Sequence, residues 1–454
     1  MTTLHPLTAL AASILLVVFL IGWCRLHAFF ALLLGALAVA LMTGSGSAVS
    51  SVESVLKEMG ALTGSIGYSI AVAAVIGAAL MESGAADRIV RTFLRALGEK
   101  RAPWALLGSG FILGVPVFFD TVFFLLIPLA RALSARTGKN YLLHVMAICA
   151  GAVVTHATVP PTPGPLAMAE ILKLDTGFAI IVGAAAGILP AVAGIWFARW
   201  LDARRPVPMR AAAGSTLEAV GEAAGREEAS LPGFFASVAP VVVPVVLIAA
   251  VSIGGSFRES IGDGAWGAIA FFGNKNVALT LGALIAVGVY LKQTRRSWRD
   301  TGHVVGEPLG TAGVIILITA AGGAYGAMIR ASGVGDLLRD WMSHTGASPV
   351  ILAWALSALL RAAQGSTTVA VITTAGLMTT LGGAEGLGVN PIFLYLAIGY
   401  GGLCFSWMND SGFWLYSRMS GMTEGETLRS WSVLLSIISV VGLFEAWALS
   451  VVFR

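Results

Sequence analysis

Residues 155–165 of the chain read THATVPPTPGP, and they interrupt one of its most apolar segments. Four prolines within six residues remove backbone N–H donors, and a helix cannot continue through them. The apolar run before this stretch, residues 141–158, has the composition of a membrane-spanning helix. Non-helical backbone survives at membrane depth only where protein or a water-filled cavity surrounds it. The stretch therefore predicts a broken helix beside a polar site inside a membrane protein.

Composition places the whole chain in the membrane class. Of its 454 residues, 57% are hydrophobic and 11% are charged, whereas soluble domains carry about 25% charged residues. The apolar runs form two sets, one in each half of the chain. They lie at 7–22, 27–43, 64–82, 103–133, 141–158 and 177–198, and then at 233–254, 264–291, 308–330, 347–381, 391–408 and 429–452.

Three further polar segments interrupt these apolar runs. Residues 114–120 (GVPVFFD) divide the run at 103–133, and residues 361–368 (RAAQGSTT) divide the run at 347–381. Each of these two runs is too long for one helix and too broken for two crossings, so each is predicted to form a re-entrant hairpin. Residues 406–412 (SWMNDSG) end another run. Helix ends at such breaks present unpaired amides and a positive dipole end, which suit an anion.

A hydrophilic linker at residues 201–230 separates a first repeat, residues 1–200, from a second, residues 231–454. If the hairpins are not counted as crossings, each half crosses the membrane five times, and an odd number inverts the second half relative to the first. With the N-terminus outside, most of the 28 Lys and Arg residues fall in cytoplasmic loops, as the positive-inside rule requires. The expected fold is an all-α polytopic membrane protein of two inverted five-crossing repeats, each with one re-entrant hairpin and one broken helix.

Four ionisable side chains lie within the breaks, where charge is costly and usually marks function. Asp120 and Asp410 are carboxylates, His156 titrates near neutral pH, and Arg361 is a cation whose planar fork suits a carboxylate. Structural interpretations remain open for all four. Asp120 is a candidate helix N-cap, His156 a hydrogen-bonded structural histidine, Arg361 the partner of either carboxylate, and residues 409–412 an interfacial turn.

The motifs at the breaks also have a familiar order. They are VPVFFD at 115–120 followed by LLIPL at 125–129, PPTPGP at 160–165, AQGSTTVA at 363–370 and NDSGFW at 409–414. With these motifs the chain resembles the gluconate permease family of proton-coupled sugar-acid symporters, within a wider ion-transporter superfamily. The resemblance implies import of gluconate or another small hydroxy or amino carboxylate, elevator-type movement and a homodimer.

The sequence departs from the family's pattern at three places. Thr162 and Trp407 stand where the family has histidine, and Thr121-Val122 follow Asp120 in place of Val-Gly. These differences lie at the predicted site, so the resemblance implies transport and leaves open which carboxylate is carried.

The leading hypothesis is a secondary active transporter that imports a small hydroxycarboxylate by proton symport. Arg361 and the hairpin amides are predicted to hold the carboxylate, and neighbouring polar side chains to bind the hydroxyl groups. The predicted substrate-binding residues are Arg361, Gln364, Gly365, Ser366, Thr367, Thr368, Thr162, Gly164, Asn409 and Ser411. The predicted proton carriers are Asp120, His156 and Asp410.

Two transport alternatives remain. Unwound carbonyls and Asn, Ser and Thr oxygens can coordinate a hard cation, so a sodium-coupled carrier of D-glycerate or D-serine is the first. A passive anion channel is the second.

Other classes of function lack their sequence signatures. The sequence has no Walker-type phosphate loop, no HExxH and no recognisable nucleophile–base pair, which argues against an enzyme or an ATP-driven pump. Cys24, Cys149 and Cys404 lie far apart, so no metal site or disulfide is expected. No cofactor and no nucleic-acid partner are predicted. The expected location is the bacterial cytoplasmic (inner) membrane, with the chain crossing it many times.

Overall fold

The computed structural model describes residues 6–43, 47–98, 101–116, 118–210, 231–255, 258, 261–332, 348–380, 387–408 and 410–453. Every regular element within these ranges is a helix, which confirms the all-α prediction. Seven helices in the described part of the chain are long and apolar enough to cross a membrane.

The described part of the first half contains ten helices, of which all but α4 and α8 overlap the predicted apolar runs. They are α1 (Pro6–Gly22), α2 (Ala28–Thr43), α3 (Ala48–Glu82), α4 (Ala85–Leu97), α5 (Ala102–Leu113), α6 (Phe119–Thr137), α7 (Tyr141–Thr158), α8 (Pro163–Ile171), α9 (Thr176–Ala186) and α10 (Ile188–Arg204). Helix α3 begins well before the apolar run at 64–82. The Ser47 side chain caps it by accepting from the Ser50 amide at 3.1 Å, so the polar turns that follow remain helical.

The second half begins after the linker. Its helices are α12 (Phe234–Gly255), α13 (Asp263–Phe272), α14 (Lys275–Thr294), η4 (Trp298–Thr301), α15 (Gly302–Ala331), α17 (Pro349–Gln364), α18 (Thr367–Thr380), α20 (Pro391–Gly401), α21 (Ser411–Ser420), α22 (Glu424–Thr427), η5 (Leu428–Ser432) and α23 (Val433–Val452). Of these, η5 is a π-helical turn at the start of α23.

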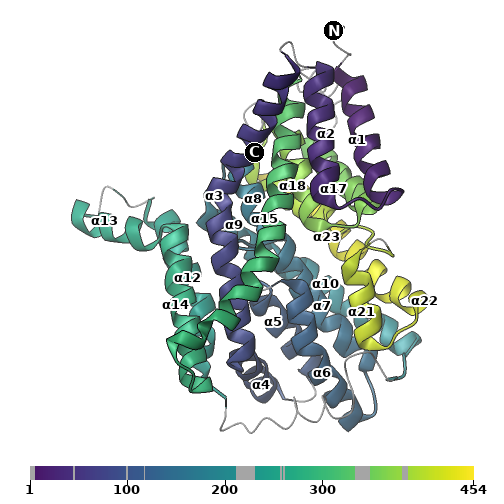
Figure 1. Ribbon diagram of the computed structural model, residues 1–454. Helices are drawn as coiled ribbons and strands as arrows, with labels where there is room; N and C mark the ends of the chain where they lie inside the picture. The colour runs from purple at the N-terminus through teal and green to yellow at the C-terminus, as the bar shows by residue number, and fades with distance from the viewer. Residues whose placement is uncertain are drawn as a thin grey trace.

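One predicted span is wrong, because the apolar run at 264–291 is two helices. Gly273 ends α13, and the Asn274 side chain caps α14 by accepting from the Asn276 amide at 3.0 Å. Hydropathy does not reveal where α13 ends and α14 begins, because Gly273 and Asn274 lie inside one apolar run. Helix α13 has no buried residue and projects to the side of the molecule (Figure 1).

The helices on either side of the two predicted hairpin breaks lie at opposite ends of the molecule. In Figure 1, α17 and α18 lie near the top with α1 and α2, whereas α5 and α6 lie near the bottom with α4. Helices α17 and α18 have 16 and 14 residues, or about 24 and 21 Å at 1.5 Å per residue. Both are shorter than a hydrocarbon core of about 30 Å, so neither crosses a bilayer alone.

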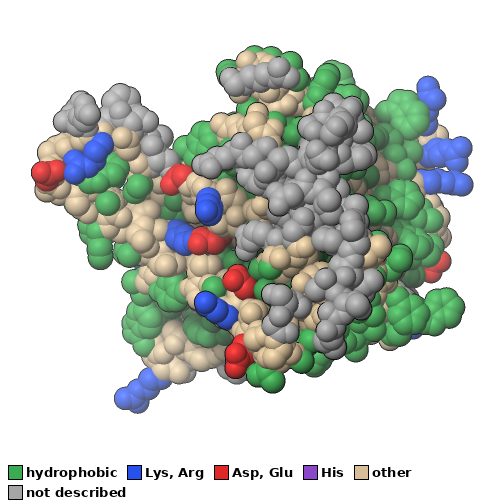
Figure 2. Space-filling view, turned by 90° about the horizontal axis from the view of Figure 1, so that it is seen from above, with side chains coloured by type: hydrophobic (Ala, Val, Ile, Leu, Met, Phe, Trp, Pro, Cys, Tyr) green, Lys and Arg blue, Asp and Glu red, His purple; other side chains and the backbone are tan. Residues whose placement is uncertain are grey.

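The long helices α3 and α15 join the two halves. Leu62 of α3 lies against Gly323 of α15, and Gly67 of α3 lies against Ile316 of α15. As the residue number rises along α3, the number of the contacted residue in α15 falls, so the two helices run antiparallel. Seen from above, apolar side chains lie along much of the molecule's rim, and several Asp, Glu, Lys and Arg side chains lie on the face inside it (Figure 2). An apolar rim is what a bilayer requires of the surface that faces it.

Helices α15 and α18 cross so closely that a larger residue at the crossing is predicted to lower the stability of the protein. A Cβ built on Gly326 of α15 would lie 2.7 Å from the Cα of Gly376 in α18, and the reverse holds for Gly376. Because both atoms belong to backbones, the helices must separate to admit a methyl group. Gly326→Ala is expected to cost about 1–3 kcal/mol, measured as a lower thermal midpoint in detergent. Gly310→Ala, on the same helix with no atom within 4 Å of the new Cβ, should not lower the midpoint.

Candidate functional site

The four polar breaks predicted from the sequence are breaks between helices in the structure. Residues 114–118 separate α5 from α6, and residues 159–162 separate α7 from α8. Only Gly365 and Ser366 separate α17 from α18, and residues 402–410 separate α20 from α21. Gly365 adopts a left-handed conformation with a φ of 79°, which glycine reaches without the penalty of a Cβ.

Three of these breaks meet at one cavity of about 450 Å³. It lies between the start of α6, the tip between α17 and α18, the start of α21 and the π-helical turn η5. The lining residues are Phe118, Phe119, Asp120, Val153, His156, Arg361, Gly365, Ser366, Thr367, Thr368, Leu403, Asp410, Ser411, Gly412, Trp431 and Leu435. The cavity therefore brings together most of the predicted site residues from both halves of the chain.

Four predicted residues are not among those that line the cavity. Thr162 and Gly164 belong to the proline-rich break instead. The Thr162 hydroxyl donates to the carbonyl of Val159 at 2.7 Å, and a Cβ on Gly164 would lie 3.1 Å from Val371 of α18. Thr162 therefore bonds within its own break, and Gly164, in the first turn of α8, packs closely against α18. Asn409 and the side chain of Gln364 lie outside the described residues.

An ion pair between Arg361 and Asp410 lies at the centre of the polar wall. The Arg361 side chain is 2% exposed, and its Nη2 donates to Asp410 Oδ2 while its Nη1 donates to the carbonyl of Gly365. Asp410 Oδ1 accepts the amide of Gly412 at 2.9 Å, which makes Asp410 the N-cap of α21. The structural interpretation of Arg361 as a partner of Asp410 is therefore confirmed, and Arg361 also lines the cavity.

A second hydrogen-bonded chain reaches the same carboxylate from η5. Trp431 Nε1 donates to Ser406 Oγ at 2.7 Å, and the Ser406 hydroxyl donates to Asp410 Oδ2. Neither Ser406 nor Trp431 was among the predicted site residues. Serine is common in polar breaks, and tryptophan is common where an apolar run meets the membrane surface, as Trp431 does at the start of the run at 429–452. Neither residue therefore stands out in the sequence.

Three helix N-termini open toward the cavity. They belong to α6 at Phe119 and Asp120, α18 at Thr367 and Thr368, and α21 at Ser411 and Gly412. First-turn amides have no partner within their own helix. Helix α6 has Phe118 as its N-cap residue and no side-chain cap, so its first-turn amides remain available for a ligand, whereas Asp410 already accepts the Gly412 amide of α21. Together with the Arg361 guanidinium, these helix ends favour a bound anion.

Asp120 and His156 occupy the first-half side of the cavity. Asp120 lies in the first turn of α6 with an exposed side chain, and Phe118 is the N-cap residue, so the interpretation of Asp120 as the N-cap is wrong. His156 Nδ1 is buried, with no hydrogen-bond partner among the described residues. Its ring lies edge-on to Phe118, with the two ring centroids 6.5 Å apart. Both side chains therefore line the cavity from the first half of the chain.

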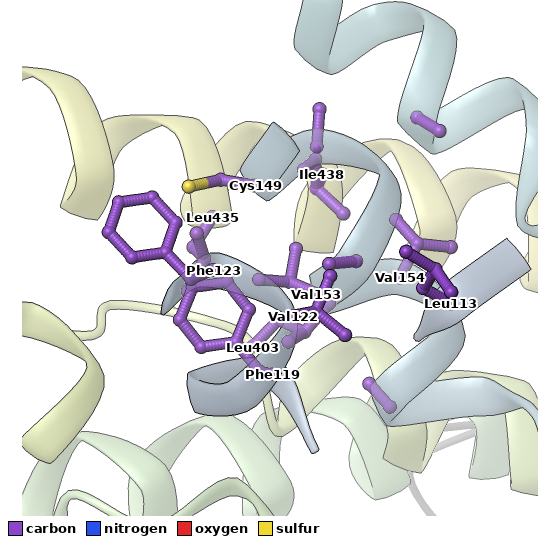
Figure 3. Packing of buried hydrophobic residues seen from close by; sticks show 14 of the residues in the cluster. Leu113, Phe119, Val122, Phe123, Cys149, Val153, Val154, Leu403, Leu435 and Ile438 are labelled. Atoms are coloured by element: carbon purple, nitrogen blue, oxygen red, sulfur yellow. The ribbon is translucent and has the colours of Figure 1, made fainter. Parts of the chain in front are cut away.

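The remaining cavity wall is apolar and comes from both halves. Figure 3 shows Phe119, Val153, Leu403 and Leu435 gathered from four different segments, with Val122 and Phe123 packed in the same cluster. The Phe119 ring also packs on Trp431 with centroids 5.0 Å apart. A cavity with one charged wall and one apolar wall fits a small molecule that carries a carboxylate at one end.

Comparison with known proteins identifies the family. Residues 5–452 match the family model described as GntP family permease. The chain belongs to this family of permeases. It is 32% identical to the high-affinity gluconate transporter of Escherichia coli (strain K12), over 98% of this chain and 100% of the relative. It is also 32% identical to the Gnt-II system L-idonate transporter of the same organism, over 98% of this chain and 99% of the relative.

A solved structure supports the fold of this permease. The YdaH transporter of Alcanivorax borkumensis superposes with a TM-score of 0.62 over 94% of this chain and 97% of its own, at 16% sequence identity. At that identity the likeness shows the fold alone. Membership of the family makes the chain a transporter, not an enzyme, and a multi-pass protein of the bacterial inner membrane.

The left-handed glycine at the hairpin tip provides a test of the site. Gly365→Ala puts a Cβ into a conformation that costs about 1–2 kcal/mol, and it disturbs the carbonyl that accepts from Arg361. We expect lower stability and a higher KM for transport, measured by initial uptake rates. Gly138→Ala, at a φ of 68° with no atom within 4 Å of the new Cβ, should carry the same strain and leave KM unchanged.

Proposed function

We propose that this permease imports a small sugar acid such as gluconate, coupled to protons, and that the cavity between α6, α17–α18 and α21 is its binding site. The observation that carries the proposal is a buried arginine facing a cavity at which three helix N-termini converge. Relatives that are about one-third identical along the whole chain transport gluconate and L-idonate. Both ligands are hydroxycarboxylates, small enough for a cavity of about 450 Å³ that has an arginine and several hydroxyl-bearing side chains in its wall.

The polar wall supplies partners for each part of such a substrate. The guanidinium of Arg361 and the first-turn amides of α18 hold the carboxylate. The hydroxyl groups of Ser366, Thr367, Thr368 and Ser411 line the same wall and bind the hydroxyls of the sugar acid. Each of these side chains both donates and accepts hydrogen bonds, which matches a substrate with several hydroxyl groups.

The charges around the cavity support coupling to a cation. Among the described lining residues, Asp120 and Asp410 are acidic and Arg361 is the lone arginine or lysine. The ion pair with Asp410 already neutralises Arg361. An anionic substrate would then add a second uncompensated negative charge beside Asp120, and the two like charges would repel each other. A proton on Asp120 or His156 removes that repulsion, so substrate and proton bind together.

The movement that we propose is of the elevator type, within two inverted repeats at residues 1–200 and 231–454. In support, the helix pairs α5–α6 and α17–α18 lie at opposite ends of the molecule (Figure 1), and α3 and α15 run antiparallel. Inverted repeats with broken helices at matching places are typical of secondary transporters.

Uptake by proteoliposomes tests the proposal. Purified permease in sodium-free vesicles with an imposed inward proton gradient should concentrate labelled gluconate, and a protonophore should abolish the accumulation. Unlabelled L-idonate, D-glycerate and D-serine, added as competitors, rank the carboxylates. If accumulation required sodium, the coupling ion would be sodium and not the proton. If gluconate equilibrated without accumulating, the protein would be a channel. Failure to move any of the four acids under any gradient would overturn the proposal.

A further inference from the structure

We infer that Trp431 and Ser406 are positioning residues for substrate binding, which act by holding Asp410 and, through it, Arg361 in place. The inference rests on the proposed function, since it assigns a role at the proposed substrate site. It starts from the hydrogen-bonded chain that runs from η5 through Ser406 and Asp410 to Arg361.

The direction of this chain is fixed by the chemistry of its members. An indole nitrogen is only a donor, so Ser406 Oγ must accept from Trp431. The single hydroxyl proton of Ser406 is then directed to Asp410 Oδ2, and the other lone pair of that oxygen faces the guanidinium of Arg361. All of these donors are buried: Trp431 and Arg361 are each 2% exposed, and Ser406 is 0% exposed. Water therefore does not replace a missing donor easily.

The consequence is that both lone pairs of Asp410 Oδ2 are occupied, so the carboxylate is held in one orientation at the cavity wall. Asp410 is held at three points, by Ser406, by Gly412 and by Arg361. Arg361 is in turn held by Asp410 and by the carbonyl of Gly365 at the hairpin tip. Loss of the Trp431 donor frees the Ser406 hydroxyl to rotate, and the carboxylate and guanidinium then lose a fixed orientation toward the substrate.

The local backbone places Trp431 for this role. Residues Leu428–Ser432 form a π-helical turn, a feature that often occurs at functional sites. From this turn the Trp431 ring packs against Phe119 with centroids 5.0 Å apart and against Tyr416 with centroids 5.5 Å apart. One side chain thus contacts α6, which carries Asp120, and donates to Ser406, which in turn donates to the Asp410 carboxylate that orients Arg361.

Trp431→Phe tests the inference, because it keeps a six-membered ring for the packing and removes the N–H donor. We expect the KM for gluconate uptake to rise about tenfold, the usual effect of one lost hydrogen bond to a buried polar network, with a small change in Vmax. Ser406→Ala should raise KM by at least as much. The double variant should match Ser406→Ala alone, since both changes break the same chain. Ser406→Thr, which keeps the hydroxyl, should restore most of the affinity.

The chain offers a matched control. Trp354 Nε1 donates to Ser439 Oγ at 2.9 Å, which is the same kind of bond between α17 and α23, and neither residue lines the cavity. Trp354→Phe and Ser439→Ala should leave KM unchanged. If the Trp431 and Ser406 variants also left KM unchanged, or lost only Vmax and thermal stability, the positioning role would be wrong. If the wild-type protein failed to take up any sugar acid, the proposed function would fail first, and this outcome is distinct from an unchanged KM in the variants.

Discussion

Asp120→Asn is expected to abolish concentrative uptake while leaving exchange of substrate across the membrane intact. Each pH unit of gradient corresponds to a tenfold ratio for one coupled proton, so two units drive at most about 100-fold accumulation. Asparagine keeps the size and hydrogen-bonding capacity of Asp120 but carries neither the charge nor the proton. The variant should therefore equilibrate labelled gluconate at a ratio near one. The measurement is the internal-to-external ratio at steady state, together with counterflow in vesicles preloaded with unlabelled gluconate.

Asp175→Asn is the matched control for the change at Asp120. Asp175 caps α9 by accepting from the amide of Phe178 at 2.7 Å, and asparagine caps helices almost as well. This variant should accumulate gluconate as the wild type does. Full accumulation by Asp120→Asn would instead assign the proton to His156, and His156→Gln would then be the variant that loses accumulation.

Arg361→Lys is expected to raise the KM for gluconate on the order of 100-fold, because a lysine cannot reproduce the planar fork that bonds both Asp410 and Gly365. The positive charge survives, so the protein should still fold. Initial rates over a range of gluconate concentrations measure the effect. Arg210→Lys, which weakens an exposed bidentate pair with Glu426 at 2.6 and 2.9 Å, serves as the control and should leave KM unchanged.

A double variant separates substrate binding from folding. Removal of Arg361 alone leaves a buried carboxylate unpaired, which costs about 3–5 kcal/mol. Arg361→Gln with Asp410→Asn removes both charges and retains a side chain that can cap α21. We expect this variant to recover much of the thermal stability lost by Arg361→Gln and to remain unable to bind gluconate. Recovery of transport along with stability would show that Arg361 has only a structural role.

The breaks in the fold could be predicted from the sequence because clustered prolines and charged side chains seldom occur inside a continuous membrane helix. Helix α7 ends before the proline-rich stretch and α17 ends at the tip before Gly365, as expected. The expectation that all of 160–165 is unwound is wrong, because α8 begins at Pro163 and proline is well tolerated in the first turn of a helix. The stop at Gly273 was missed, because a glycine and a cap residue inside an apolar run barely change hydropathy. The start of α3 was missed for the opposite reason, since its polar first turns resemble a loop.

The charged residues of the site could be predicted from the sequence, whereas the residues that hold them in place could not. Asp120, His156, Arg361 and Asp410 stand out in an apolar sequence because charge in a bilayer is expensive, and the structure places all four at one cavity. Thr162 and Gly164 were included because they lie in a break, yet proximity in sequence does not decide which side chains face the cavity. Ser406 and Trp431 are visible only once the fold brings η5 against the break before α21.

Proton movement coupled to substrate entry tests the central claim most directly. Sodium-free proteoliposomes containing the permease would be placed in a weakly buffered medium with a pH indicator, with no initial gradient and with the membrane potential clamped. Addition of gluconate should make the medium more alkaline, with protons entering in a fixed ratio to labelled gluconate, and Asp120→Asn should abolish the signal. Entry of labelled gluconate without any change in external pH would contradict proton symport through this cavity.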